Sequence, residues 1–503
     1  MSDSAAHEAS PPLNPFNQWM NQGAQSAERS QWAQAVQCFC AAIEIKPDSS
    51  MAFHQLGLSM CQLGQFQAGV ECFDSAIRWD PCNPLPVMDR GNAFKELGHA
   101  QLAMNDYLQA LQLKPDYAIA HFNLASLYRQ QMQLQKAADC YRAVLELEPQ
   151  RPDVWSNLGV TLKELGEFDR ALTCFDQALA IDPGFADASW NKATTLLMRG
   201  NYKSGWPLFE SRWQLDAAGL AKQSQLTSTL WLGEASLRHR TILICTEQGL
   251  GDTIQCLRYL RLLVDMGAQV LVEVQASLVR LVSQIDGLAG VMVYGEPRPA
   301  TDFHCPFMSL PLAFKTDLST IPFPAGYLLA DKLLSAEWAN KLAQDRRPKV
   351  GLVWSGGDLF AANARRNIPL STFEVLGTLP LSFHSLQVGA SARQALNDLK
   401  AAEWQGPNIT DQTDLLTDFA DTAALVDNLD LVIAVDTSVA HLAGAMGKPT
   451  WLLNRFDGCW RWLKHRTDSP WYQSMRVFNQ SNPTEWLPVL ETVQHELQQL
   501  SRN

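Results

Sequence analysis

The feature that most constrains the fold is a 34-residue period that extends over residues 16–215. Four classes of residue keep this period: a proline, two series of small residues and an aromatic residue. The prolines are Pro47, Pro81, Pro115, Pro149 and Pro183, and the aromatics are Phe39, Phe73, Tyr107, Tyr141, Phe175 and Phe209. The small residues are Gly23, Gly57, Gly91, Ala125, Gly159 and Ala193 in one series, and Ala35, Gly69, Ala103, Ala137, Ala171 and Gly205 in the other. A period of this length indicates stacked supersecondary units rather than one globular core.

Each period predicts a pair of helices. Small residues allow the two helices to approach closely, an aromatic side chain fills the space beside them, and the proline ends the second helix because it lacks an N–H. The predicted units are 16–49, 50–83, 84–117, 118–151 and 152–185, with a degenerate sixth from 186 to about 215. This pattern resembles the tetratricopeptide repeat. The resemblance implies a superhelix whose concave groove binds a protein or peptide; the alternative is a purely structural spacer.

Composition excludes several classes of protein. The net charge of −12, from 40 Lys+Arg against 52 Asp+Glu, disfavours a nucleic-acid partner, which requires a basic face. No apolar run approaches the ~20 residues of a transmembrane helix, and the N-terminus lacks the pattern of a secretory signal. The 11 cysteines are scattered, without metal-ligand spacing. We therefore expect a cytoplasmic protein with no metal, no cofactor and no transmembrane segment.

The second half of the chain changes period. Apolar segments such as TILIC, QVLVEV, VGLV and LVIAV alternate with helical patterns, which is typical of parallel α/β sheets. The predicted fold class is therefore α + α/β: a helical solenoid followed by two doubly wound, Rossmann-like lobes. We predict a disordered segment at 1–15, the array at 16–215 and a connector at 216–240. The lobes follow at 241–345 and 346–503, the second with a closing helix.

Three segments at predicted strand ends carry candidate chemistry, because ligands bind beyond the carboxyl ends of parallel strands. The first is EQGLGDTIQ, residues 247–255. Gly249 and Gly251 allow a tight turn close to a ligand, and Asp252 stands where the next helix begins. On spacing alone, Asp252 or Thr253 is a helix N-cap.

The second segment is VDTSVAHLAGAMGKP, residues 435–449. Asp436 ends a strand, and Thr437 and Ser438 begin a helix whose free N–H groups favour an anion. His441 lies on the same helix face as Thr437. Capping of the helix, with His441 packed against the other lobe, remains an equal alternative.

The third segment is WSGGDLFAANARRNIP, residues 354–369. Its two arginines, Arg365 and Arg366, precede the next predicted helix and are candidates to bind a diphosphate, because a guanidinium pairs with phosphate oxygens through two hydrogen bonds. The alternative is that one of the two belongs to a solvated basic loop. No Walker loop or dinucleotide fingerprint is present, which disfavours a generic ATPase or dehydrogenase.

These segments, together with DFADTAALVDNLD and WRWLKHRTDSPWYQSMRVF, resemble the bacterial tetratricopeptide-linked glycosyltransferases. That family is related to the lipopolysaccharide heptosyltransferases of glycosyltransferase-B fold, and the similarity spans residues from about 200 to 480. By this resemblance Asp252 is the acceptor-activating carboxylate in an acceptor loop with Glu247, Gln248, Gly249 and Gly251. Nucleotide-sugar contacts are implied for Ser355, Gly356, Arg366, Gln387, Asp436, Thr437, Ser438 and His441.

The chain departs from the family pattern at three positions: Phe360 and Asn363 replace a histidine and an acidic residue, and Val388 replaces a lysine. Two functions are therefore considered. One is a metal-independent, inverting glycosyltransferase of hexosyl- or heptosyl-transferring type, whose donor is a nucleotide-diphosphate sugar and whose repeat array presents a protein or glycan acceptor. The other is a transferase-like domain that has lost activity and serves as a protein-binding scaffold.

Overall fold

The computed structural model describes residues 14–215, 226–247, 249–356, 363–377, 379–401, 404–464, 466–483 and 485–500. The chain forms two compact units, Met1–Ala188 and Ser189–Asn503. The first is entirely helical within its described part, and the second contains two parallel β-sheets. The predicted α + α/β fold class is confirmed.

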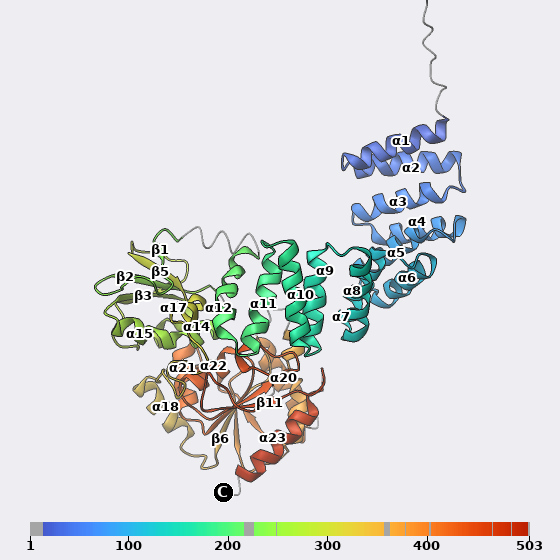
Figure 1. Ribbon diagram of the computed structural model, residues 1–503. Helices are drawn as coiled ribbons and strands as arrows, with labels where there is room; N and C mark the ends of the chain where they lie inside the picture. The colour runs from blue at the N-terminus through green and yellow to red at the C-terminus, as the bar shows by residue number, and fades with distance from the viewer. Residues whose placement is uncertain are drawn as a thin grey trace, which may run out of the picture. The chain divides into compact units, whose positions relative to one another are not determined.

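The first unit is a stack of antiparallel helix pairs (Figure 1). The pairs are α1 (Pro15–Glu28) with α2 (Trp32–Ile45), α3 (Ser50–Gln62) with α4 (Phe66–Trp79), α5 (Pro84–Glu96) with α6 (Ala100–Leu113), α7 (Ala118–Gln130) with α8 (Leu134–Leu147), and α9 (Pro152–Glu164) with α10 (Phe168–Ile181). The helix pairs have the period predicted from the sequence.

Contacts within the pairs explain the phased residues. A Cβ atom on Gly23 would lie 2.5 Å from the ring of Phe39, and a Cβ on Gly159 would lie 2.5 Å from the ring of Phe175. Only glycine allows the ring to approach this closely. Phe39 also packs in a core cluster with Leu56 of the following pair, so this aromatic stabilises both its own unit and the stack. Each phased proline follows the end of the second helix, as predicted.

The second unit begins with the end of α11 (Ala186–Met198), α12 (Tyr202–Phe209) and the 3₁₀ helix η1 (Glu210–Gln214). Its first sheet has the strand order β1-β5-β2-β3-β4 and is parallel throughout. The strands are β1 (Thr229–Leu230), β2 (Thr241–Cys245), β3 (Gln269–Val274), β4 (Gly290–Val293) and β5 (Phe303–Pro306). The helices are α14 (Leu250–Cys256), α15 (Leu260–Asp265), α16 (Val279–Val282), α17 (Leu310–Ala313) and α18 (Lys332–Leu342).

The second sheet has the order β11-β10-β9-β6-β7-β8, also parallel. Its elements are β6 (Lys349–Val353), α19 (Asn363–Arg366), the 3₁₀ helix η5 (Leu370–Leu376), β7 (Ser382–Ser385), α20 (Ala390–Ala401), β8 (Ile409–Thr410), α21 (Phe419–Asp427), β9 (Leu431–Val435), α22 (Ser438–Ala445), β10 (Thr450–Asn454), the 3₁₀ helix η7 (Trp460–Trp462), β11 (Met475–Asn479) and α23 (Leu487–Leu500). Numbered from β6, this is the doubly wound order 3-2-1-4-5-6.

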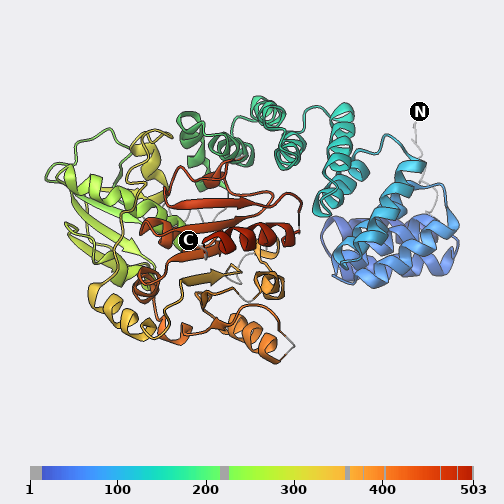
Figure 2. The same ribbon diagram turned by 90° about the horizontal axis from the view of Figure 1, so that it is seen from below.

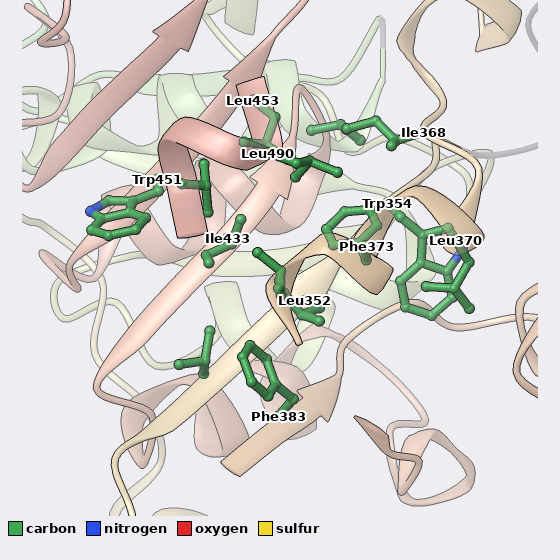
Figure 3. Packing of buried hydrophobic residues seen from close by; sticks show 14 of the residues in the cluster. Leu352, Trp354, Ile368, Leu370, Phe373, Phe383, Ile433, Trp451, Leu453 and Leu490 are labelled. Carbon is green, nitrogen blue, oxygen red and sulfur yellow. The ribbon is translucent and has the colours of Figure 1, made fainter. Parts of the chain in front are cut away.

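Burial on both faces explains the apolar strand sequences, since every residue of β9 and β10 is buried. Figure 2 shows α23, in dark red, beside the strands of this sheet. Leu490 of α23 joins a core that contains Leu352, Phe373 and Ile433 (Figure 3).

Two details differ from the sequence prediction. The predicted connector at 216–240, of which 216–225 lies outside the described residues, includes the edge strand β1, whose two residues are too few to leave a pattern. After β6, where the strand–helix alternation of the sequence predicts an α-helix from Ser371, the chain forms the 3₁₀ helix η5. Among the described residues, no helix is both long and apolar enough to cross a bilayer.

Candidate functional site

The strand order places a candidate site between β6 and β9, where the direction of winding reverses. In doubly wound sheets the chain segments that follow two such strands usually diverge, and the region at the carboxyl ends of these strands is the usual ligand site. This region of the second sheet is called the crevice below. Ser355 and Gly356 follow β6, and Asp436 and Thr437 follow β9. Two of the three predicted segments therefore meet at one edge of the second sheet.

The N-terminus of α22 lies at this crevice. Thr437 is the N-cap residue, but its side chain makes no capping hydrogen bond. Its Oγ1 atom is buried and has no hydrogen-bond partner among the described residues. Most buried polar atoms have a partner, so this hydroxyl is a candidate ligand contact beside the free N–H groups of the first turn.

Arg366, the last residue of α19, approaches the same point. Its Nη1 donates to the backbone carbonyl of Asp436 at 2.6 Å. A Cβ atom on Gly356 would lie 2.0 Å from Nη2 of Arg366, so glycine is required for this approach. Burial lowers the pKa of Arg366, and the charge of Asp436 opposes this effect. Arg365 instead pairs with Asp457 at 3.1 Å. The two arginines therefore have different environments.

Ser355 and Gln387 contact one another in the same region. The Ser355 N–H donates to Oε1 of Gln387 at 3.0 Å, and the Gly356 N–H donates to Oδ1 of Asn367 at 2.8 Å. These bonds fix the loop after β6. Val388, next to Gln387, is 54% exposed. The structure thus brings Ser355, Gly356 and Gln387 together at the end of β6; their proposed contacts with a nucleotide sugar stay a prediction.

His441 is buried within α22, and its ring lies between the two lobes. Its Nδ1 forms a 2.8 Å hydrogen bond with the hydroxyl of Tyr472, and its ring stacks on Trp462 with centroids 5.2 Å apart. A Cβ on Gly251 of the first lobe would lie 2.8 Å from Cδ2 of His441. These contacts are the ones expected from the packing alternative. Ser438, the first residue of α22, also lies against Gly251.

Burial, reinforced by nearby Arg461, lowers the pKa of His441 to about 3. The imidazole is therefore neutral near pH 7, and its Nε2, 3.8 Å from the Asp436 carboxylate, makes no ion pair there.

This pKa shift predicts a pH-dependent stability. In the unfolded chain the histidine binds a proton near pH 6.5, whereas in the folded chain it does so only near pH 3. The contribution of the neutral His441 to the free energy of unfolding is therefore fully present above about pH 6.5. It decreases as the pH falls toward 3, by up to ~1.4 kcal/mol per pH unit. We expect His441→Gln to have a lower melting temperature at pH 7 but a shallower decrease between pH 6.5 and 4.5. The exposed His495→Gln should keep the parental slope; equal slopes in all three proteins would contradict the prediction.

Asp252 lies in the first turn of α14, which begins beyond the carboxyl end of β2. Gly249 is the N-cap, so neither Asp252 nor Thr253 occupies that position. The Asp252 Oδ2 accepts the Gly249 N–H at 3.0 Å, as in a capping box. The Oδ1 atom forms an ion pair with Nη2 of Arg461, from η7 of the second lobe. The Asp252 side chain remains 23% exposed.

Glu247 has a different role from Asp252 in the same loop. Its carboxylate accepts hydrogen bonds from Nε and Nη2 of Arg212 at 2.7 and 3.0 Å, and from the Met308 N–H at 3.0 Å. The side chain is only 5% exposed. Glu247 therefore attaches η1 to the first sheet, and its carboxylate is not accessible to an acceptor.

Sequence reasoning missed Arg461, although it stands in the quoted segment WRWLKHR. Gln248 and Phe360 lie outside the described residues, as does the side chain of Asn363. In the ranges that the structure describes, no group of three or more His, Cys, Asp or Glu side chains is arranged to hold a metal ion.

Comparison with known families supports both halves of the prediction. The tetratricopeptide repeat model matches residues 118–151 and 152–185, which are the bounds predicted for units four and five, and a second TPR repeat model matches 91–131. The model of glycosyltransferase family 9 (heptosyltransferase) matches residues 400–453, which include β9 and α22. The chain thus has tetratricopeptide repeats in its N-terminal region and a glycosyltransferase-type match in its C-terminal region.

Individual relatives are more distant. Protein FlbA of Caulobacter vibrioides is 28% identical over 313 residues, which cover 58% of this chain and 51% of the relative. The chain therefore spans about half the length of this curated relative. Among solved structures, a tetratricopeptide repeat protein from Parabacteroides merdae (18% identity, 42% of this chain, 87% of that chain, TM-score 0.37) and Pseudomonas aeruginosa pilF (17%, 42%, 98%, 0.36) are similar.

Proposed function

We propose that the second unit transfers a sugar from a nucleotide-diphosphate sugar to a protein or glycan acceptor, with inversion at the anomeric carbon. One observation gives the main support for this proposal. At the N-terminus of α22 the buried Thr437 hydroxyl has no hydrogen-bond partner among the described residues. Arg366 lies beside it, on the carbonyl of Asp436. An anionic diphosphate fits this combination of helix N-terminus, hydroxyl and guanidinium.

The reaction is a single displacement. The acceptor oxygen forms a bond to the anomeric carbon while the bond from that carbon to the diphosphate oxygen breaks, and the electron pair leaves with the nucleoside diphosphate. Asp252 takes the proton of the acceptor hydroxyl. Arg366 and the N–H groups of α22 stabilise the negative charge that develops on the leaving diphosphate without a metal ion. The two lobes form a glycosyltransferase-B arrangement, and the repeat array presents the acceptor.

Thermal stabilisation by a panel of nucleoside diphosphates and their sugars tests this proposal. A ligand at a hundred times its Kd should add ~2.7 kcal/mol of stability. The matching nucleoside without its diphosphate is the control and should have little effect. Release of nucleoside diphosphate with an acceptor extract then measures turnover. Absence of stabilisation by every diphosphate would contradict the proposal.

One observation favours the alternative, a scaffold without turnover. Both oxygens of Asp252 already accept hydrogen bonds, from Gly249 and Arg461. Stabilisation by a nucleotide sugar without any release of nucleoside diphosphate would support this alternative.

A further inference from the structure

Arg461 connects the lobe that contains the crevice with the lobe that contains Asp252. It lies in η7 of the second lobe, yet its Nη2 donates to Asp252 and its Nε donates to Oε1 of Gln255, both in α14. Residues 252 and 255 lie three positions apart, on one face of that helix. One guanidinium therefore contacts two residues of α14 from the opposite lobe.

The surroundings of Arg461 keep it charged and in one orientation. Its Nη1 donates to Sγ of Cys459 at 2.9 Å, and the guanidinium lies 4.3 Å from the centroid of the Trp460 ring. Burial opposes its charge, but Cys459, Asp252 and Asp436 together raise its pKa. Because Arg461 is only 8% exposed, its direction is set by packing rather than by solvent.

The two hydrogen bonds do not use every lone-pair site of the Asp252 carboxylate. A carboxylate has about four lone-pair sites, and the Gly249 N–H and Arg461 use two of them. The two donors approach different oxygens, so the plane of the carboxylate is fixed and its remaining lone pairs point in set directions. With Arg461 absent, only the bond to Gly249 would orient the group.

We propose that Arg461 is a positioning residue: it orients Asp252 toward the acceptor and makes that orientation depend on contact between the lobes. The inference rests on the proposed transfer reaction. Arg461 acts through Asp252 and does not bind the donor. Its loss should therefore lower the rate of transfer and leave donor affinity unchanged.

The experiment compares kcat for sugar transfer and donor Kd in the full chain and its variants. Arg461→Met, similar in length, should lower kcat by ~10²-fold, the usual cost of a misplaced reacting group, with an unchanged donor Kd. Arg461→Lys keeps a cation within reach of Asp252 but lacks the planar fork, so it should recover only part of the loss. A residue that only stabilised the lobes would not produce this separation of kcat from Kd.

A matched control removes a different contact between the lobes. Arg280 of α16 pairs with Asp418 at 3.0 Å and with Asp421 at 3.3 Å, both on the second lobe. Arg280→Ala should keep the parental kcat.

Three results would overturn the inference. The first is a parental kcat in Arg461→Lys when Arg461→Met either keeps the parental kcat or does not fold. The others are weaker donor binding in the Arg461 variants, or a loss of kcat in Arg280→Ala as large as that in Arg461→Met. A parent chain that transfers no sugar from any donor would instead refute the proposed function, and the role of Arg461 with it.

Discussion

Replacing Asp252 with asparagine should lower the rate of sugar transfer by ~10²–10⁴-fold, the usual contribution of a positioned general base. The amide has nearly the size of the carboxylate but cannot take the acceptor proton. Donor affinity should persist, because the contacts proposed for the diphosphate, Thr437 and Arg366, belong to the other lobe. The measurement is kcat together with donor Kd for the parent and the variant.

The same substitution should also reduce stability, because Asp252 has two hydrogen-bond donors. The Gly249 N–H and the guanidinium of Arg461 bind different oxygens of the carboxylate, and an amide offers only one oxygen. One donor loses its partner, and Arg461 is buried, so the expected cost is ~1–3 kcal/mol. A lower rate in the single variant could therefore reflect a loosened fold.

The double variant Asp252→Asn/Arg461→Met separates these effects. Removing the guanidinium removes the buried charge that Asp252→Asn leaves without its carboxylate, which is the costly part of breaking a buried ion pair, while Oε1 of Gln255 loses its donor in exchange. We expect its melting temperature to return toward the parental value while transfer stays as slow as in Asp252→Asn. Recovery of transfer in the double variant would show that Asp252 has a structural role only.

Local patterns were sufficient to predict the repeat array and the two sheets. Within each helix pair, the small residue and the aromatic ring that it meets are a fixed, short distance apart in the sequence. The proline that follows the pair is also at a fixed distance from them. Buried parallel strands leave continuous apolar runs such as LVIAV of β9. The position of Asp436 and Thr437 at a strand end also followed from this pattern, because the end of an apolar run marks the end of a strand.

Contacts between distant segments could not be predicted in this way. Asp252 and Arg461 are 209 residues apart, and Glu247 and Arg212 are 35 residues apart in segments of different character. The sequence placed Glu247 and Asp252 in one loop, but only their partners and burial distinguish the buried carboxylate of Glu247 from the partly exposed one of Asp252.

The environment of His441 shows the same limit. Helix spacing correctly places it on the face of α22 that carries Thr437. Whether that face meets a ligand or the other lobe depends on how closely α14 approaches, and this approach is possible because residue 251 is a glycine. Its roles as a nucleotide-sugar contact and as a packing residue therefore remained equal alternatives in the sequence.

Replacing Arg366 with alanine should weaken donor binding by about ten- to a hundredfold, since a hydrogen bond to a charged group contributes ~1.5–3 kcal/mol. Its guanidinium is half-buried at the Asp436 carbonyl, beside the N-terminus of α22, where the diphosphate is proposed to bind.

Arg365→Ala is the matched control: it removes the same charge from the neighbouring position, but that side chain is 40% exposed and paired with Asp457. We expect Arg365→Ala to keep donor Kd close to the parental value. Titration of both variants with the nucleotide sugar that stabilises the parent measures the difference, and equal Kd values in the two variants would show that the effect is general electrostatics rather than a contact made by Arg366.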